Sequence, residues 1–290
     1  MIKSMTGFGA GEGAVGNWRV AVEVRSVNHR FFNPSIKLPN DLSRWEAEVR
    51  EALRRAVARG HVTLSARVER ASADSTHIDE NRFGAYLDQI RKLQERFGIA
   101  SPIDAATILR LPDVIASEPD EVTGTPEEFV AVVERAVDSL NRMRAAEGAK
   151  LAAYIQARLA IISEAVGRIA ERAPQRLAEQ RDRLRASVQE IASGVAIDDQ
   201  RLAQEVAILA DRLDVSEEIS RFHAHLGAVA STLASPPADG VGKRIGFLLQ
   251  ELLREANTTG SKANDAAIVR EVILIKEELE RIREQVENLE

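Results

Sequence analysis

Residues 268–289 read IVREVILIKEELERIREQVENL, and their apolar positions define how the C-terminal part of the chain is organised. Seven apolar residues follow each other at alternating spacings of four and three: Ile268, Val272, Ile275, Leu279, Ile282, Val286 and Leu289. This spacing is the seam of a coiled coil, in which one stripe of a helix packs against another helix. We therefore expect a C-terminal helix that buries this stripe against a partner helix, either within the chain or in a second subunit.

The stretch before this helix is also helical in character. Residues 127–173 and 175–193 are rich in Ala, Arg, Glu and Leu and contain few residues that break helices. Pro174 lies between them and should stop or kink the first helix, because proline lacks a backbone N–H and its ring clashes with the preceding turn. We therefore predict a long antiparallel helical hairpin in this part of the chain.

The first 70 residues have a different, two-residue periodicity. Apolar and polar residues alternate in two segments, as in half-buried strands: Val20, Val22 and Val24, and later Val62, Leu64, Ala66 and Val68. Between them, apolar residues recur every three or four positions and indicate an amphipathic helix packed on the sheet: Leu42, Trp45, Val49 and Leu53. A shorter helical pattern then ends near Phe97, and a loop rich in Pro, Asp and Gly between Pro112 and Pro126 marks a boundary.

Together these patterns predict an α+β fold. We expect a small N-terminal sheet with helices in residues 1–120 and the long helical hairpin in residues 121–200. A helical, coiled-coil-like C-terminal domain should occupy residues 201–290 and carry the chemistry.

The composition excludes several classes of protein. A chain of 290 residues with 44% apolar content can form a large core, yet no stretch reaches the roughly 20 uncharged apolar residues that cross a membrane. The first residues lack an apolar signal core, so we expect a cytoplasmic protein with no membrane partner. The absence of cysteine excludes disulfides, thiolate catalysis and cysteine-bound metals, so a bound metal would be a hard divalent ion held by carboxylate, imidazole or backbone oxygen.

Charge is distributed unevenly along the chain. Residues 1–70 hold 12 Lys and Arg against 7 Asp and Glu, a balance of +5, and the remaining residues hold 27 against 38, a balance of -11. This asymmetry suits a protein that binds a polyanion with one part and places carboxylates in another. Chance scatter of surface charge is the simpler alternative.

The first candidate site residues lie on a predicted helix that begins near Asp214. Asp214 and Glu217 have the spacing of a capping box, with Asp214 as N-cap and Glu217 reaching back. Further along, Glu218 and His225 are seven residues apart and therefore lie on the same side of the helix, beside its apolar face. A carboxylate and an imidazole can then project into one partly enclosed space.

The next predicted helix, residues 243–257, is apolar around most of its circumference and should be buried. It nevertheless carries Glu251 and Glu255 one turn apart, with Arg244 and Arg254 close to the same face. Carboxylates rarely enter such surroundings unpaired, so these two need arginines, a metal ion or both.

Two explanations fit these carboxylates. In the first, a hard divalent cation is held by Glu218, His225, Glu251 and Glu255. In the second, His225 is structural and the glutamates form buried ion pairs with Arg244, Arg254 and Arg221. In either case Gly260 could end the helix in a left-handed conformation and bring Lys262 near Glu255.

A second candidate region runs from Val24 to Asn33, where a strand leads into a loop dense in cations, amide donors and aromatic rings. Phosphate contacts and base stacking need this mixture. The alternative is a strand end at which Phe31 or Phe32 fills the core. The sequence has no P-loop, no dinucleotide-binding glycine motif and no serine-nucleophile elbow, so we expect no nucleotide cofactor.

These motifs together resemble the YicC family of bacterial proteins. At the N-terminus the likeness covers residues 2–9 and the loop at residues 24–32, and at the C-terminus it covers residues 214–219 with His225, residues 250–258 and residues 260–262. Four separated motifs in the same order are far more specific than any single one. The central hairpin offers no distinctive match.

The resemblance implies an endoribonuclease that cleaves single-stranded RNA in RNA decay or processing. It also implies dependence on Mn²⁺ or Mg²⁺ and a ring-like homo-oligomer, a hexamer. We expect catalysis from His225, Glu251, Glu255 and Lys262, and metal binding from Glu218, His225, Glu251 and Glu255. We expect RNA contacts from Lys3, Arg25, Asn28, His29, Arg30, Arg244 and Arg254.

Two other classes of function remain possible from the sequence. An RNA-binding adaptor that recruits another nuclease would explain the cationic loop but not Glu251 and Glu255. A coiled-coil scaffold would explain the heptads but neither of the other features.

Overall fold

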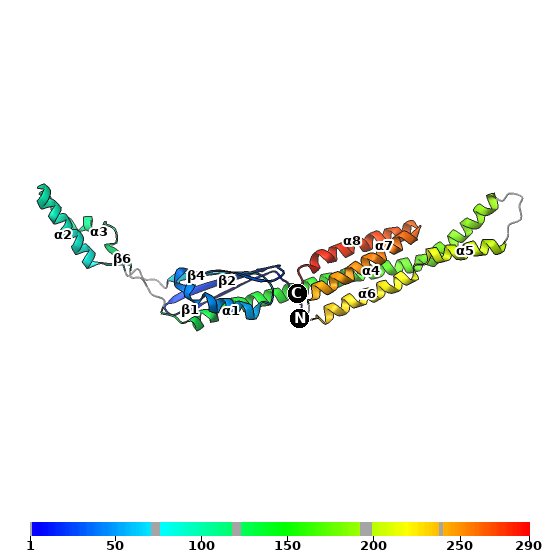
Figure 1. The fold of residues 1–290 in the computed structure, drawn as a ribbon, viewed down its shortest axis with the longest axis horizontal. Coiled ribbons are helices and arrows are strands. Elements are labelled where there is room, and N and C mark those ends of the chain that lie inside the picture. Colours follow the sequence, from blue (N-terminus) through cyan, green and yellow to red (C-terminus); the bar gives the residue numbers. More distant parts are fainter. Residues whose placement is uncertain (1, 71–75, 118–122, 192–198, 238–239) are drawn as a thin grey trace.

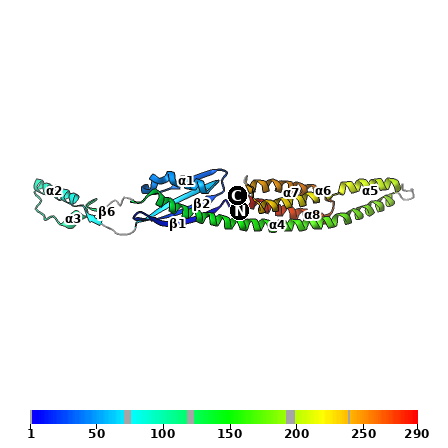
Figure 2. The same cartoon turned by 90° about the horizontal axis from the view of Figure 1, so that it is seen from below.

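The computed structural model describes residues 2–70, 76–117, 123–191, 199–237 and 240–290. The molecule is elongated, and a sheet unit and a helical bundle follow one another along one very long helix, α4 (Pro126–Ile191) (Figure 1). The view turned by 90° shows α4 running past both units (Figure 2). The predicted fold class, a small sheet followed by long helices, is confirmed.

The sheet contains four strands in the order β1-β2-β4-β3. Its strands are β1 (Gly7–Val15), β2 (Trp18–Val27), β3 (Phe32–Lys37) and β4 (Gly60–Arg70), and only the β3–β4 pair is parallel. The predicted strand residues lie in β2 and β4 and turn Val20, Val22, Val24, Val62 and Leu64 into the core. The predicted amphipathic helix is also confirmed: a short 3-10 helix (Asn40–Trp45) leads into α1 (Glu46–Ala56), and both bury their apolar residues there.

The first half of α4 also contributes buried apolar residues to this core, and it packs closely on β1. A Cβ atom on Gly9 would lie 2.2 Å from the carbonyl oxygen of Ala136 and 2.3 Å from the amide nitrogen of Leu140. A residue with a side chain would therefore push β1 away from α4, so glycine permits the close contact of strand and helix.

The prediction that the first helix of the hairpin ends at Pro174 is wrong. α4 continues through Pro174 for 66 residues in all, a length of about 100 Å. Residues on both sides of the proline are held by the bundle, because Ile169 is buried in its core and the guanidinium of Arg176 donates to three backbone carbonyls: those of Lys262, Ala263 and Leu213. α4 ends at Ile191, and α5 (Asp199–Leu213) runs back along α4 (Figure 1).

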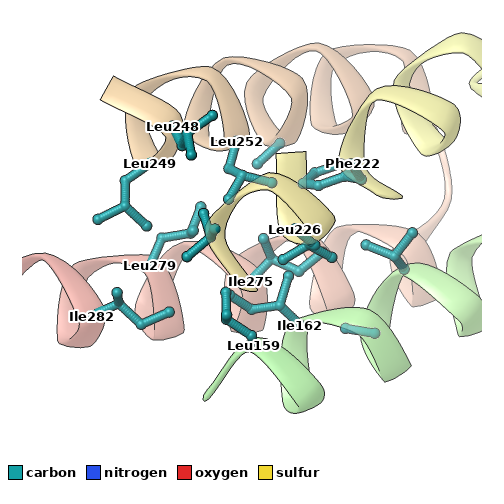
Figure 3. Close-up of a cluster of buried hydrophobic side chains, with 14 of the residues drawn as sticks. Leu159, Ile162, Phe222, Leu226, Leu248, Leu249, Leu252, Ile275, Leu279 and Ile282 are labelled. Carbon is teal, nitrogen blue, oxygen red and sulfur yellow. The ribbon is translucent and has the colours of Figure 1, made fainter. Parts of the chain in front are cut away.

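The bundle is formed by α4 with α6 (Ser216–Ala234), α7 (Val241–Ala263) and α8 (Ala266–Val286). Figure 3 shows apolar side chains from all four helices meeting in its core, among them Ile162, Phe222, Leu252 and Ile275. All seven heptad residues of the C-terminal stretch are buried, so the predicted stripe is confirmed. Its partners are α4 and α7 of the same chain.

The two ends of the described chain meet where the sheet unit joins the bundle (Figure 1). The backbones of Lys3 and Glu290 exchange hydrogen bonds of 3.0 and 2.8 Å. Arg144 of α4 is fully buried there, donates to the carbonyl oxygen of Ser4 at 2.7 Å and forms an ion pair with Glu290. This ion pair and the short ladder fasten the last residues to the start of the sheet unit.

A small unit lies beyond the sheet at the far end of the molecule (Figure 1). It contains α2 (Glu80–Phe97), α3 (Ala105–Leu109) and the paired strands β5 (Thr76–Ile78) and β6 (Ile115–Ser117). α2 confirms the predicted helical pattern up to Phe97. None of the described helices is both long and apolar enough to span a membrane.

Candidate active site between α6 and α7

The carboxylates expected to carry the chemistry lie where α6 and α7 pack against each other. α6 begins at Ser216, close to the predicted start, but the predicted capping box is wrong. The Asp214 carboxylate accepts hydrogen bonds of 2.9 Å from the backbone N–H and the hydroxyl of Ser216, and these bonds lower the pKa of Asp214. Glu217 does not reach back, because its carboxylate forms an ion pair with Arg221 one turn further along α6.

The first charged contact between the two helices joins Glu218 of α6 to Lys262 of α7. Glu218 is buried, and its Oε1 lies 2.8 Å from the Lys262 ammonium, which also donates to the carbonyl oxygen of Asp214 at 3.0 Å. The other oxygen, Oε2 of Glu218, is buried without a hydrogen-bond partner among the described residues. An unpaired carboxylate oxygen inside a protein is costly and marks a place where a donor or a cation would be stabilised.

Lys262 reaches Glu218 because α7 extends further than predicted. The helix continues through Gly260 to Ala263, and the left-handed residue that follows it is Asn264, with φ of 40°. The extra turn carries Lys262 across to the first turn of α6, so the predicted cap at Gly260 is wrong. Lys262 forms its ion pair with Glu218.

The second contact joins Glu255 of α7 to Arg221 of α6. Glu255 is buried, and its Oε1 lies 3.4 Å from the Arg221 guanidinium. The hydrogen bond to Glu255 is the largest cause of the raised pKa of Arg221, and the charge of Glu217 adds to it. One turn after Glu255, the hydroxyl of Thr259 is fully buried and has no partner among the described residues.

His225 of α6 and Glu251 of α7 lie one helical turn beyond the contact between Arg221 and Glu255. His225 lies four residues after Arg221 on α6, and Glu251 lies four residues before Glu255 on α7, so both continue the stripes that carry the first two contacts. Both side chains are half-buried, and neither forms a hydrogen bond or ion pair with a described residue. An imidazole and a carboxylate, each partly accessible, are therefore left without a partner among the described residues.

The four predicted metal ligands do not form one compact group. Within the described ranges, no three His, Asp or Glu side chains are gathered as a metal-binding set. Glu218 and Glu255 are instead neutralised by Lys262 and Arg221, and the Arg221–Glu255 pair is the one that the ion-pair explanation anticipates. The feature that does fit a cation is the unpaired Oε2 of Glu218.

The predicted cationic loop lies between β2 and β3 and is exposed. The Arg25 guanidinium stacks 5.4 Å from the ring centre of Phe8, and the Arg30 guanidinium stacks 5.2 Å from that of Phe31. Phe31 is 64% exposed and therefore does not fill the core, whereas Phe32 packs partly against it.

Two other loop residues are engaged with backbone groups. Nδ1 of His29 lies 2.9 Å from the carbonyl oxygen of Phe31. Nδ2 of Asn28 donates to the carbonyl oxygen of Glu287 at 2.7 Å, so this loop is tied to the end of α8. Arg244 and Arg254, the remaining predicted RNA contacts on α7, are exposed and form no ion pair with a described residue.

Two residues at this site were not among the predicted site residues. Arg221 was predicted only as an ion-pair partner of the glutamates, and Thr259 had no predicted role in the site. The signal for Thr259 is its spacing, because Glu251, Glu255 and Thr259 recur every four residues along one stripe of α7.

The whole chain is similar to known protein sequences. Residues 2–153 match the family described as "Endoribonuclease YicC-like, N-terminal region", and residues 169–290 match "Endoribonuclease YicC-like, C-terminal". The chain is 34% identical over 298 residues to "Probable endoribonuclease YicC" of Clostridioides difficile (strain 630). It is 31% identical over 293 residues to the protein of the same name in Haemophilus influenzae, and both alignments cover both chains completely.

Proposed function

Because the chain belongs to the YicC-like endoribonuclease family, we propose that it cleaves phosphodiester bonds within single-stranded RNA, in cytoplasmic RNA decay or processing. The observation that carries this proposal is the match over the full length to two relatives whose printed names are probable endoribonucleases. The α6/α7 contacts support placing the reaction there, because they combine buried carboxylates and cations with an unpaired imidazole.

In this proposal His225 exchanges protons with the reacting groups. A half-buried imidazole without a partner can accept a proton from an attacking hydroxyl or water and return it to the leaving oxygen. Lys262 and Arg254 are the cations that steady the phosphate, whose charge rises in the transition state. Glu251 lies one turn from Glu255 and has no ion-pair partner among the described residues, and its proposed role is to orient the imidazole or a water.

We further propose that cleavage requires Mn²⁺ or Mg²⁺. Such an ion lowers the pKa of a bound water and stabilises negative charge on a phosphoryl oxygen. The predicted ligands are Glu218, His225, Glu251 and Glu255, which are not gathered around one point among the described residues. The unpaired Oε2 of Glu218 supports this proposal, whereas the pairing of Glu255 with Arg221 supports the structural explanation.

RNA would be held by the β2–β3 loop and by exposed cations of the helices. Arg25 and Arg30, each stacked on an aromatic ring at the surface, support contacts to phosphates and bases. His29, Asn28, Lys3, Arg244 and Arg254 complete the proposed set of contacts. We also propose that the chain assembles into a hexamer, for which the exposed Val269 and Ile273 of α8 offer apolar surface.

An adaptor that binds RNA without cleaving it is the second candidate. The observation that favours it is the neutralisation of Glu218 and Glu255 by cations of the same chain, which needs neither a metal nor a substrate.

Incubation of the purified chain with end-labelled single-stranded RNA separates the two candidates. The nuclease should produce internal fragments with Mn²⁺ or Mg²⁺ and none with excess chelator. His225→Ala protein purified in parallel controls for contaminating nuclease. Intact RNA under every metal condition, together with measurable binding, would replace the nuclease proposal by the adaptor.

A further inference from the structure

A groove separate from the α6/α7 contacts lies between α7 and α8, at the end of the bundle next to the sheet unit. Its volume is about 610 Å³. Five of its apolar lining residues are buried, four of them in the core of the bundle: Met5, Leu249, Leu279, Val286 and Leu289. The floor of the groove is therefore formed by well-packed, buried side chains.

The rim of this groove combines one exposed aromatic ring with cations. Phe247 of α7 lies at the rim and is 61% exposed, an unusual placement for a large apolar side chain on a packed helix. Lys243 and Lys276 also line the groove, and neither forms an ion pair with a described residue. By contrast, Arg283 of the groove is paired with Glu280 at 3.5 Å.

The β2–β3 loop contacts one residue that lines the groove. Glu287 lines it, and the carbonyl oxygen of the same residue accepts the hydrogen bond from Asn28. The loop also carries Arg30 and the exposed ring of Phe31, and Arg25 lies near the end of β2. The cations and the aromatic ring of the groove therefore lie at the same end of the bundle as those of the loop, and the Asn28–Glu287 hydrogen bond links the two regions.

We propose that this groove binds a nucleotide of single-stranded RNA, with its base stacked on Phe247 over the apolar floor and its flanking phosphates at Lys243 and Lys276. The inference rests on the proposed function, because it assigns a place to the substrate on the way to α6 and α7. Aromatic rings bind unpaired bases regardless of sequence, and lysines bind phosphates. Bases inside an RNA duplex cannot reach a ring in this way, so the groove selects single strands.

A peptide or a second copy of the chain could also cover Phe247. The charged residues that line the groove are four cations, Arg59, Lys243, Lys276 and Arg283, and two carboxylates, Glu280 and Glu287, so its net charge is opposite to that of a nucleotide. Charge complementarity therefore favours RNA as the occupant.

Gly246 gives a way to fill the groove without disturbing the protein. It lines the groove, and a Cβ atom added there would have no heavy atom within 4 Å. Gly246→Leu should therefore occupy the space of the base and leave the packing of α7 intact. Gly167 of α4 has equally open surroundings outside the groove, so Gly167→Leu is the matched control.

The test measures binding of a labelled 12-nucleotide single-stranded RNA to the full chain by fluorescence anisotropy, with chelator present and at several salt concentrations. Phe247→Ala should weaken binding about tenfold, since stacking on one aromatic ring typically contributes that much. Gly246→Leu should weaken it similarly. Phe97→Ala on α2 is the control, because Phe97 is 64% exposed and lies beside Arg96 as Phe247 lies beside lysines. Lys243→Ala with Lys276→Ala should lower the log–log salt slope by about 1.4.

Each outcome decides a different question. If the wild-type chain binds and cleaves RNA but Phe247→Ala and Gly246→Leu bind as tightly as their controls, the groove assignment is overturned and the proposed function stands. If the wild-type chain binds no RNA at low salt, the proposed function itself fails. If Phe247→Ala changes the sedimentation of the protein and not its RNA affinity, the groove is an interface between copies and the inference is overturned.

Discussion

The substitution Lys262→Met tests how much the Glu218–Lys262 ion pair stabilises the packing of α6 on α7. It removes the ammonium that lies 2.8 Å from Oε1 of Glu218 and 3.0 Å from the carbonyl oxygen of Asp214, and keeps most of the side chain. Glu218 would then be a buried carboxylate with neither oxygen bound to a cation, since its Oε2 already has no partner among the described residues.

The expected cost follows from the burial of the two partners. Removing one partner of a buried ion pair typically costs about 3–5 kcal/mol of unfolding free energy. The Lys262 side chain is 32% exposed, so water already screens the pair and the cost should be lower, about 2 kcal/mol. For a chain of this size that corresponds to a fall in Tm on the order of 5 °C.

Thermal and urea unfolding of four proteins measure this cost: wild type, Lys262→Met, Glu218→Gln and the double variant. The double variant should be more stable than Lys262→Met alone, because it leaves no unpaired charge behind. Lys262→Arg is the matched control and should melt close to wild type. If Lys262→Met unfolds like wild type and the double variant shows no coupling, the ion pair does not fasten α6 to α7 and the reasoning is refuted.

Three further predictions concern other parts of the chain. Arg25→Ala combined with Arg30→Ala should weaken RNA binding and lower the log–log salt slope by about 1.4; an unchanged affinity and slope would mean that the loop is structural. Ile275→Asp places a charge at a fully buried heptad position and should cost about 4 kcal/mol or more, so a wild-type melting curve would rule out the packing. Arg172 of α4 donates a 2.8 Å hydrogen bond to the carboxylate of Asp265, the N-cap residue of α8, and this bond holds the pKa of Asp265 below its usual 3.8. The carboxylate therefore stabilises the fold above that pH, and the stabilisation is lost as the pH falls toward the folded-state pKa. Arg172→Gln should therefore lose less unfolding free energy than wild type between about pH 5 and about pH 3, measured by circular dichroism, and an equal loss in both proteins would contradict the assignment.

The sequence predicts the elements well where one periodicity extends over many residues. The heptad residues of α8 and the alternating valines of β2 are buried as expected, because each pattern has one face that must leave water. Pro174 is different, since its local preference to end a helix is opposed by packing that a sequence does not display. Ile169 before it and Arg176 after it are both fixed by the bundle, so tertiary contacts keep α4 continuous.

The candidate site is predictable in its residues and less so in their pairing. The burial of Glu255 follows from the apolar helix around it, and the sequence analysis anticipated Arg221 as its partner. The pairing of Glu218 with Lys262 depends on how far α7 continues past Gly260, which helix-end signals placed one turn too early. The groove beside Phe247 could not be predicted, because it needs α7, α8 and the sheet unit to be placed together.

Cleavage of labelled single-stranded RNA by Glu251→Gln protein tests most directly whether the α6/α7 pair is the active site. Glu251 is half-buried and makes no ion pair with a described residue, so the substitution should leave the fold unchanged, as circular dichroism and sedimentation can verify. The account predicts a loss of cleavage of about a hundredfold or more with RNA binding retained, and chelator should have the same effect on the wild-type chain. Full, chelator-insensitive cleavage by a folded Glu251→Gln protein would contradict it.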